Sequence, residues 1–352
     1  MSIYKSKTYI EDLKTAINMS LGIGQLKNSK ILITGATGTI GSFLVDMLMQ
    51  YNQDANANIT VYAAGRKIEK LKTRFDSVKN DCLNYVEYDL CAPILFNYSV
   101  DYIIHAAGNA FPAAFAENPV ETIVGNVQGT YHLLEYAKRN KAKRLLYIST
   151  GEVYGKSTGD VNEFKEDYSG YVNPVSPRSC YPNSKRVTET LCTSYTQQYG
   201  VDTVIVRPCH TYGPCMSETD NRANVQFIRN VLNDEDIILK SSGKQMRSYC
   251  YIADCASIII SVLVKGNSGE AYNSANSISR ITIAGLAETI AEVGGKKVVY
   301  EIPTLDEVRA FTPIDRQVLN TAKIEALGWK GMFDISTGVE HTIQILKEME
   351  DK

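Results

Sequence analysis

The chain has 352 residues, enough for one large or two small domains with a substantial core. Its net charge of −2 gives no reason to expect nucleic acid or an anionic membrane surface as a partner. No apolar run reaches the ~18 residues that a membrane span needs, and the N-terminus lacks the layout of a signal peptide. The eight cysteines form neither a CxxC pair nor a metal-like cluster with histidine. We therefore expect a cytoplasmic protein with free thiols, no metal and no membrane association.

The first 29 residues precede the first strand signal and carry a helical pattern. Tyr9, Leu13, Ala16 and Ile17 recur at the spacing of an amphipathic helix. We predict an N-terminal helical extension over residues 1–29 that packs on its own domain rather than on a second subunit.

A strand, a glycine-rich turn and a helix follow in direct succession. The strand is the run 30–34, and apolar residues from Phe43 to Leu48 indicate the helix. Such a turn lets backbone N–H groups approach a pyrophosphate at the positive end of a helix. Glycine spacing alone is a weak signal, but its place between strand and helix predicts a dinucleotide site. The predicted contacts are Gly35, Thr37, Gly38, Thr39, Ile40 and Gly41.

Tyr181 and Lys185 lie four residues apart, which places them on one face of a helix. An ammonium beside a phenol stabilises the phenolate, so we expect the pKa of Tyr181 to fall from ~10 toward the working pH. That phenol would take a proton from a sugar hydroxyl while a hydride leaves the same carbon. Thr150, just after the apolar run 145–148, would hold the hydroxyl by a hydrogen bond. A bare YxxxK is common on helix surfaces, and the glycine-rich turn upstream is what distinguishes this one.

Six segments, taken together in their order and spacing, resemble the extended short-chain dehydrogenase/reductase family in its nucleotide-sugar branch. The resemblance covers about Lys30 to Trp329. It implies a Rossmann doubly wound parallel sheet with a smaller C-terminal α/β cap, and the alternation of strands and helices over 30–210 indicates the same sheet. We expect a NAD-binding domain over 30–207 and a mainly substrate-binding domain over 208–352, with some segments returning to the sheet. The segments are GATGTIG (35–41), HAAG (105–108), STGEVYG (149–155), CYPNSK (180–185), RPCHTYGP (207–214) and SGKQMRSYCYIAD (242–254).

The same resemblance assigns further binding residues. Arg66 stands where an acid usually bonds the ribose of NAD, which favours NADP. Redox-neutral members of the family keep NAD bound, however, so we predict NAD with NADP as the alternative. His105 is expected to position the end of its strand rather than to act as an acid or base. Tyr181 and Lys185 would also contact the cofactor, together with Asp89, Leu90, Ala106, Ala107, Gly108 and Pro208.

Substrate residues follow from the resemblance as well. Arg247 and Arg316 look like the arginines that hold the diphosphate, because forked guanidinium donors suit phosphate oxygens. His210 stands where the family more often has asparagine. The predicted nucleotide-sugar contacts are His210, Arg222, Asn224, Val225, Arg247 and Arg316.

The branch shares oxidation of sugar C4 to a 4-keto intermediate and then diverges. A 4,6-dehydratase needs an acid after Thr150, where Gly151 stands. Gly151 suits a 4-epimerase, whereas Glu152 and the loop 171–185 resemble UDP-glucuronate decarboxylases, although their usual serine is missing. We predict a decarboxylase that yields UDP-xylose or a 4-keto-pentose, with Thr150, Glu152, Tyr181 and Lys185 as its catalytic residues.

Two other functions stay open at this point. A 4-epimerase is the close alternative, and a non-catalytic NAD(P)-binding regulator is the third. The intact set of threonine, tyrosine and lysine argues against a regulator, which has no need of all three. The resemblance also suggests a homodimer formed by the helices around 118–139 and 184–199.

Overall fold

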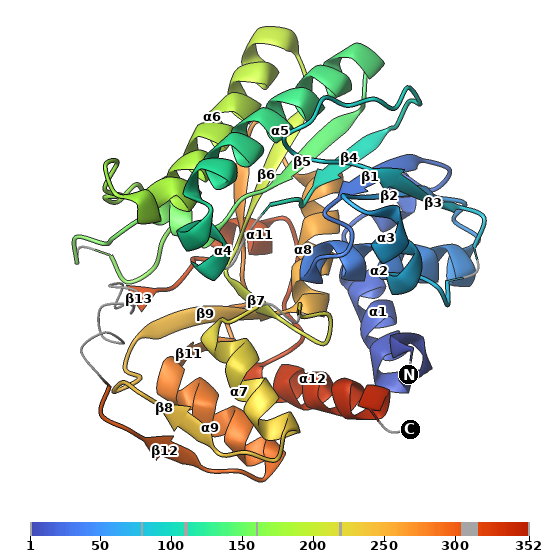
Figure 1. The fold of residues 1–352 in the computed structure, drawn as a ribbon. Coiled ribbons are helices and arrows are strands. Elements are labelled where there is room, and N and C mark those ends of the chain that lie inside the picture. The colour runs from blue at the N-terminus through green and yellow to red at the C-terminus, as the bar shows by residue number, and fades with distance from the viewer. Residues whose placement is uncertain are drawn as a thin grey trace.

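The computed structural model describes residues 2–78, 80–108, 112–159, 161–217, 220–303 and 316–350. Seven parallel strands form its central sheet in the order β10-β6-β5-β4-β1-β2-β3 (Figure 1). This is the order of a doubly wound dinucleotide-binding sheet with one strand added at the β6 edge. The Rossmann prediction is confirmed. The strands are β1 (Lys30–Thr34), β2 (Thr60–Gly65), β3 (Leu83–Glu87), β4 (Tyr102–His105), β5 (Arg144–Ile148), β6 (Thr203–Pro208) and β10 (Ala271–Ser274).

The sheet is parallel because helices cross over it and cover both of its faces. Its central strands are continuous apolar runs, and the side chains of Ile31, Ile104 and Leu146 are completely buried. In Figure 1, α5 and α6 lie on one face, while α2 and α8 lie on the other with α1 behind them. The helices around the sheet are α1 (Lys7–Met19), α2 (Thr39–Ala55), α3 (Ile68–Arg74), α4 (Pro112–Glu117), α5 (Pro119–Asn140), α6 (Cys180–Tyr199) and α8 (Ile252–Lys265).

The N-terminal helix α1 packs on its own chain, as the sequence pattern predicts. The side chain of Ser6 caps it by accepting a hydrogen bond from the Tyr9 N–H. Tyr9, Leu13 and Ala16 are buried, on a helix that contacts α2 and α8. The helix therefore completes a second layer behind the sheet.

A cap built from short strands and helices covers the carboxyl ends of the sheet strands (Figure 1). Its strand β9 pairs with β7, β11 and β13, and β8 pairs with β12. Between cap segments the chain returns to the sheet through α8 and β10, which pairs with β6. The cap elements are β7 (His210–Tyr212), α7 (Ala223–Leu232), β8 (Ile237–Leu239), β9 (Met246–Tyr251), β11 (Arg280–Thr282), α9 (Ile283–Gly294), β12 (Val298–Tyr300), β13 (Arg316–Gln317) and α12 (Ile335–Glu350). The short helix α11 (Ala322–Ala326) instead packs on β10 of the sheet.

Within the described ranges, no helix is both long enough and apolar enough to cross a bilayer. The same residues contain no group of three or more histidine, cysteine, aspartate or glutamate side chains arranged to hold a metal ion. All eight cysteines are free thiols.

Candidate active site

A cavity of about 1350 Å³ lies between the carboxyl ends of the sheet strands and the cap. In doubly wound sheets, ligands bind in the crevice at this edge, where the strand order reverses, here between β1 and β4. Most of the residues predicted from the sequence line this cavity. They are Gly35, Thr37, Gly38, Thr39, Ile40, Gly41, Arg66, Ala106, Ala107, Gly108, Thr150, Glu152, Tyr181, Lys185, Pro208, His210, Arg222, Asn224 and Arg247.

Four predicted residues are not part of the cavity lining, and each has a local reason. Asp89 is exposed and accepts the N–H of Cys91 at 2.9 Å, which closes a turn. Leu90 packs against Gly125 and Gly129 of α5. Val225 is buried on α7 next to Asn224, which does line the cavity. On β13, Gln317 faces the cavity, whereas Arg316 is exposed and reaches the Asn162 carbonyl, because adjacent strand residues point to opposite faces.

The glycine-rich turn after β1 has the backbone geometry that a pyrophosphate site needs. Gly35 has φ +68°, and a Cβ there would lie 2.7 Å from the Ala106 carbonyl oxygen. A Cβ on Gly41 would collide with the backbone of Gly35. Gly38 is the N-cap of α2 and has no side chain to cap it, so the first N–H groups of the helix remain available to an anion. Arg66 and Lys70 line the same cavity, so their positive charges could also bind the 2′-phosphate of NADP.

Several buried polar atoms in the cavity wall have no hydrogen-bond partner among the described residues. Buried polar groups in folded proteins are nearly always satisfied, so these atoms indicate where a ligand donates or accepts. A dinucleotide and a nucleotide sugar carry the hydroxyls and phosphates that would satisfy them. They are Ser149 Oγ, His210 Nδ1, Asn224 Nδ2 and Gln245 Oε1.

The end of β5 and the start of α6 bring the predicted catalytic residues together. Thr150 caps the short helical turn after β5 by accepting the N–H of Glu152 at 3.2 Å, and it lies close enough to Tyr181 to lower the pKa of the phenol. Lys185 Nζ donates to the carbonyl of Ile148 at 2.8 Å. The turn after the strand and the first turns of the helix thus lie side by side in one wall of the cavity.

Two contacts fix α6 in this position. The Tyr181 ring stacks on Phe115, with ring centroids 5.0 Å apart and planes 6° from parallel. Asn126 of α5 donates to Ser184 Oγ at 2.9 Å, which ties the two neighbouring helices beside the reactive tyrosine. The tyrosine is therefore held from both the ring face and the helix behind it.

The predicted fall in the pKa of Tyr181 is wrong for this structure. Burial raises the pKa of this phenol, and the charge of Glu152 raises it further, against smaller opposing effects of Thr150, Arg222 and Arg178. The ammonium of Lys185 lies 4.6 Å from the ring centre of Tyr147 and 5.8 Å from that of Tyr181. Burial lowers the pKa of Lys185 to about 8. The lysine, rather than the tyrosine, thus holds the proton that is lost more readily.

His105 takes the positioning role expected from the sequence. Its two ring nitrogens meet the hydroxyls of Thr34 at 2.7 Å and Thr130 at 3.1 Å. Burial lowers the pKa of His105 to about 3, with the charge of Lys185 as a second cause. The neutral ring therefore links β4, β1 and α5.

On the cap side, two guanidinium groups flank a neutral histidine. The Nε and Nη2 atoms of Arg222 bond the carboxylate of Asp220 at 2.6 to 3.0 Å. Arg247 is buried and donates to the carbonyl of Met246 at 3.0 Å. Burial, followed by the charges of Arg247 and Arg222, lowers the pKa of His210 to about 3. This wall combines two cations with a neutral histidine and an unsatisfied amide, which suits a diphosphate.

Sequence reasoning missed Arg178 and Phe115. Arg178 lines the cavity, pairs with Glu152 at 3.3 Å and lies over the Phe115 ring at 4.5 Å from its centre. The available signal was position, because Arg178 precedes Tyr181 by three residues, close to one helical turn. Phe115 comes from a segment about 65 residues earlier in the chain, and no local pattern reveals that contact.

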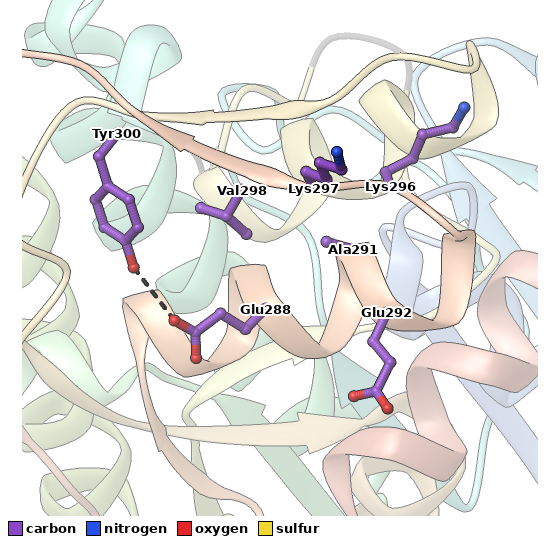
Figure 2. Close-up of a pocket in the computed structure, with 7 residues that line it drawn as sticks. All are labelled: Glu288, Ala291, Glu292, Lys296, Lys297, Val298 and Tyr300. Carbon is purple, nitrogen blue, oxygen red and sulfur yellow. Dashed lines mark hydrogen bonds between the residues drawn. The ribbon is translucent and has the colours of Figure 1, made fainter.

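A smaller cavity of about 440 Å³ lies against α9 and β12, away from these residues. Figure 2 shows the Tyr300 hydroxyl pointing at Glu288, to which it donates at 3.2 Å. None of the residues predicted for catalysis or binding lines this cavity.

Residues 31–275 match the model of the "NAD dependent epimerase/dehydratase family". The chain belongs to this family. A relative described as UDP-glucuronic acid decarboxylase 3 of Arabidopsis thaliana is 36% identical over 314 residues, covering 89% of this chain and 87% of the relative. UDP-glucuronic acid decarboxylase 1 of Xenopus tropicalis is 32% identical, covering 93% of this chain and 75% of the relative.

Solved structures of the epimerase/dehydratase fold agree with the sheet and the cap. The dTDP-glucose 4,6-dehydratase DesIV of Streptomyces venezuelae, with NAD and TYD bound, superimposes with a TM-score of 0.77 at 25% identity, covering 91% of this chain and 97% of that one. A UDP-glucuronic acid 4-epimerase variant of Bacillus cereus, in complex with NAD and a fluorinated UDP-glucuronic acid, gives 0.77 at 23% identity, covering 91% and 99%. This second likeness shows the fold.

Proposed function

We propose that this protein is an NAD-dependent enzyme that oxidises C4 of UDP-glucuronate and then decarboxylates the sugar. The observation that carries the proposal is the cluster of Thr150, Glu152, Tyr181 and Lys185 in one cavity with the glycine-rich turn. The relatives described as UDP-glucuronic acid decarboxylases support the choice of substrate. The 4,6-dehydratase reaction is disfavoured because Gly151 has no acid to offer.

The first half of the reaction is the removal of two hydrogens from C4. When bound, NAD accepts the hydride from this carbon. Thr150 and Tyr181 hold the C4 hydroxyl between them, and Tyr181 takes its proton as general base. Burial lowers the pKa of Lys185 to about 8 and raises that of Tyr181, so Lys185 loses its proton first. The tyrosinate that accepts the C4 proton then forms when the neutral amine of Lys185 takes the proton of the phenol.

The second half uses the new ketone at C4 as an electron sink. The carboxylate on C5 is now β to this ketone, so breaking the C5–C6 bond releases CO2 and leaves its electron pair as an enolate over C5, C4 and O4. Tyr181, protonated in the first half, and Thr150 donate hydrogen bonds to the enolate oxygen. A proton from water then adds at C5 to give the 4-keto-pentose. Return of the hydride to C4, with Tyr181 giving its proton back to O4, yields UDP-xylose.

A 4-epimerase is the second candidate, and Gly151 is the observation that favours it. A Cβ at this position would lie 3.4 Å from the Pro208 carbonyl oxygen and 3.5 Å from Leu319, so the glycine leaves space beside Thr150. Epimerisation requires the 4-keto sugar to turn within the cavity and adds no acid or base. The carboxylate would then remain on the product.

Incubation of the purified protein with UDP-glucuronate separates the two reactions. We expect CO2 together with UDP-xylose or the UDP-4-keto-pentose, identified by mass spectrometry. A UDP-galacturonate product without CO2 would reverse the ranking. A Tyr181→Phe variant serves as the control, because neither product forms if oxidation at C4 comes first.

We also propose that two copies of the chain associate through α5 and α6. Apolar side chains are exposed along the outer faces of this helix pair, including Val120 on α5 and Val187 on α6 at 64% and 53% exposure. Exposed apolar surface of this kind indicates a protein partner, and a second copy provides the matching face. Val187→Glu should shift the mass in sedimentation equilibrium from dimer to monomer. An unchanged mass, or a monomeric wild type, would contradict this interface.

A further inference from the structure

The cations in the cavity differ in how fully their charge is already compensated. Arg222 is held by Asp220 through two of its nitrogens, and it lies near His210 on the diphosphate wall. Arg178 instead contacts Glu152 through one nitrogen at 3.3 Å, and 43% of its side chain is exposed. A guanidinium has five N–H donors, so Arg178 can bind a second anion without releasing Glu152.

The position of Arg178 relative to the reactive groups is fixed by the fold. It lies in the turn Pro177–Ser179, directly before α6, and its guanidinium lies over the ring of Phe115. Tyr181 stacks on the same ring. Arg178 and Tyr181 thus both contact Phe115, and the charge of Arg178 reaches the phenol. Stacking fixes the plane of a guanidinium and leaves its edge donors free to bind.

A hexuronate creates an electrostatic problem at this point. Its carboxylate is attached to C5, next to the C4 hydroxyl that Thr150 and Tyr181 hold. Glu152, whose charge also reaches Tyr181, lies on the same side of the cavity. Two carboxylates so close to one another repel unless a cation lies between them.

We propose that Arg178 is the residue that selects uronate sugars, by binding the C6 carboxylate of the substrate on one edge of its guanidinium while Glu152 holds another. This assignment rests on the proposed function, since it takes the substrate to be a UDP-hexuronate. Glu152 then acts as a positioning residue that aims Arg178. The arrangement explains a glutamate beside Thr150 in a cavity that binds an acidic sugar.

Titration calorimetry on the NAD-loaded protein tests the assignment without turnover. Tyr181→Phe is the background for all samples, and the ligands are UDP-glucuronate, UDP-glucose and UDP. Arg178→Gln should weaken UDP-glucuronate binding about 10- to 100-fold, because a charge-assisted hydrogen-bonded pair is lost. The affinities for UDP-glucose and UDP should not change. Arg178→Lys should retain part of the preference for the uronate, since it keeps the charge and loses the fork.

The matched control is Arg139→Gln, which removes an exposed arginine at the end of α5 and leaves the cavity intact. It should retain the full preference for UDP-glucuronate. UDP affinity reports folding of each variant. If Arg178→Gln and Arg178→Lys both bind UDP-glucuronate as tightly as their parent, the assignment is overturned.

Failure of the assignment and failure of the proposed function give different results. If the wild-type protein releases CO2 and the Arg178→Gln variant still prefers the uronate, the proposed role of Arg178 is rejected and the proposed reaction is retained. If the wild-type protein releases no CO2 but its preference for the uronate disappears in Arg178→Gln, decarboxylation is rejected and the contact between Arg178 and the carboxylate is supported.

Discussion

The two walls of the cavity differ in whether a key cationic side chain is paired with a carboxylate. On the sheet wall, Lys185 is buried, donates to a backbone carbonyl, and among the described residues has no carboxylate within hydrogen-bonding distance, so burial lowers its pKa to about 8. On the cap wall, Arg222 donates several hydrogen bonds to the carboxylate of Asp220. A charge that takes part in proton transfer must be easy to change, whereas a charge that holds a ligand must stay fixed. Proton transfer is therefore assigned to the sheet wall, and binding of the substrate diphosphate to the cap wall.

The largest effect is expected from Tyr181→Phe on the sheet wall. Removing a general acid–base group typically lowers the rate by ~10²–10⁴-fold. The phenyl ring keeps the stacking on Phe115, so the affinity for UDP should not change. Steady-state kcat together with UDP titration checks both statements. A variant with wild-type kcat would remove the tyrosine from the mechanism.

A change on the cap wall should affect binding instead. Asp220→Asn deprives Arg222 of its carboxylate partner and loosens the guanidinium, so we expect KM for the UDP-sugar to rise about tenfold, the scale of one charged hydrogen bond. The value of kcat should stay within a few-fold. If kcat fell and KM stayed constant, the division between the walls would be wrong.

The pH dependence of kcat/KM tests whether the two walls of the cavity act independently. Because the pKa of Lys185 is lowered to about 8 and that of Tyr181 is raised, the pair loses its first proton near 8. The deprotonated pair is the active base, so kcat/KM should rise several-fold as the pH increases through this value. Lys185→Met should move the rise to higher pH, since only the raised tyrosine then titrates. Asp220→Asn should leave its midpoint in place, and a midpoint that moved would show that the two walls are coupled.

The smallest effect is expected from Gly151→Ser. The space beside this glycine accepts a Cβ at ordinary contact distances, so the change in the free energy of unfolding should stay within about 1 kcal/mol. Gly151 lines the cavity, so we expect the added side chain to reduce the space in which a 4-keto sugar would turn. Any epimer formed by the wild type should therefore decrease relative to CO2. Gly151→Ala is the matched control. If the wild type, Gly151→Ser and Gly151→Ala all give the same ratio of epimer to CO2, Gly151 does not influence which reaction occurs.

The residues that line the sheet wall could be located from the sequence because their features are local. The turn between β1 and α2 and the pair Tyr181 and Lys185 depend on spacing within a few residues, and spacing determines which side chains share a turn or a helix face. The sequence-based predictions differ from the structure where segments distant in the chain meet, or where a shift of one residue along a strand determines which side chain faces the cavity. Gln317 rather than Arg316 lines the cavity because strand neighbours face opposite ways. The pKa of Tyr181 rises because the fold buries the phenol, an effect that no i to i+4 spacing reveals.

The central claim is that hydrogen leaves C4 before the carboxylate is lost, with Tyr181 as the base. Its most direct test is a single turnover of UDP-glucuronate deuterated at C4, with CO2 release followed in time. We predict that deuterium slows CO2 release in the wild type and that Tyr181→Phe releases almost none. CO2 release at the same rate with either isotope, continuing undiminished without the phenol, would contradict the account.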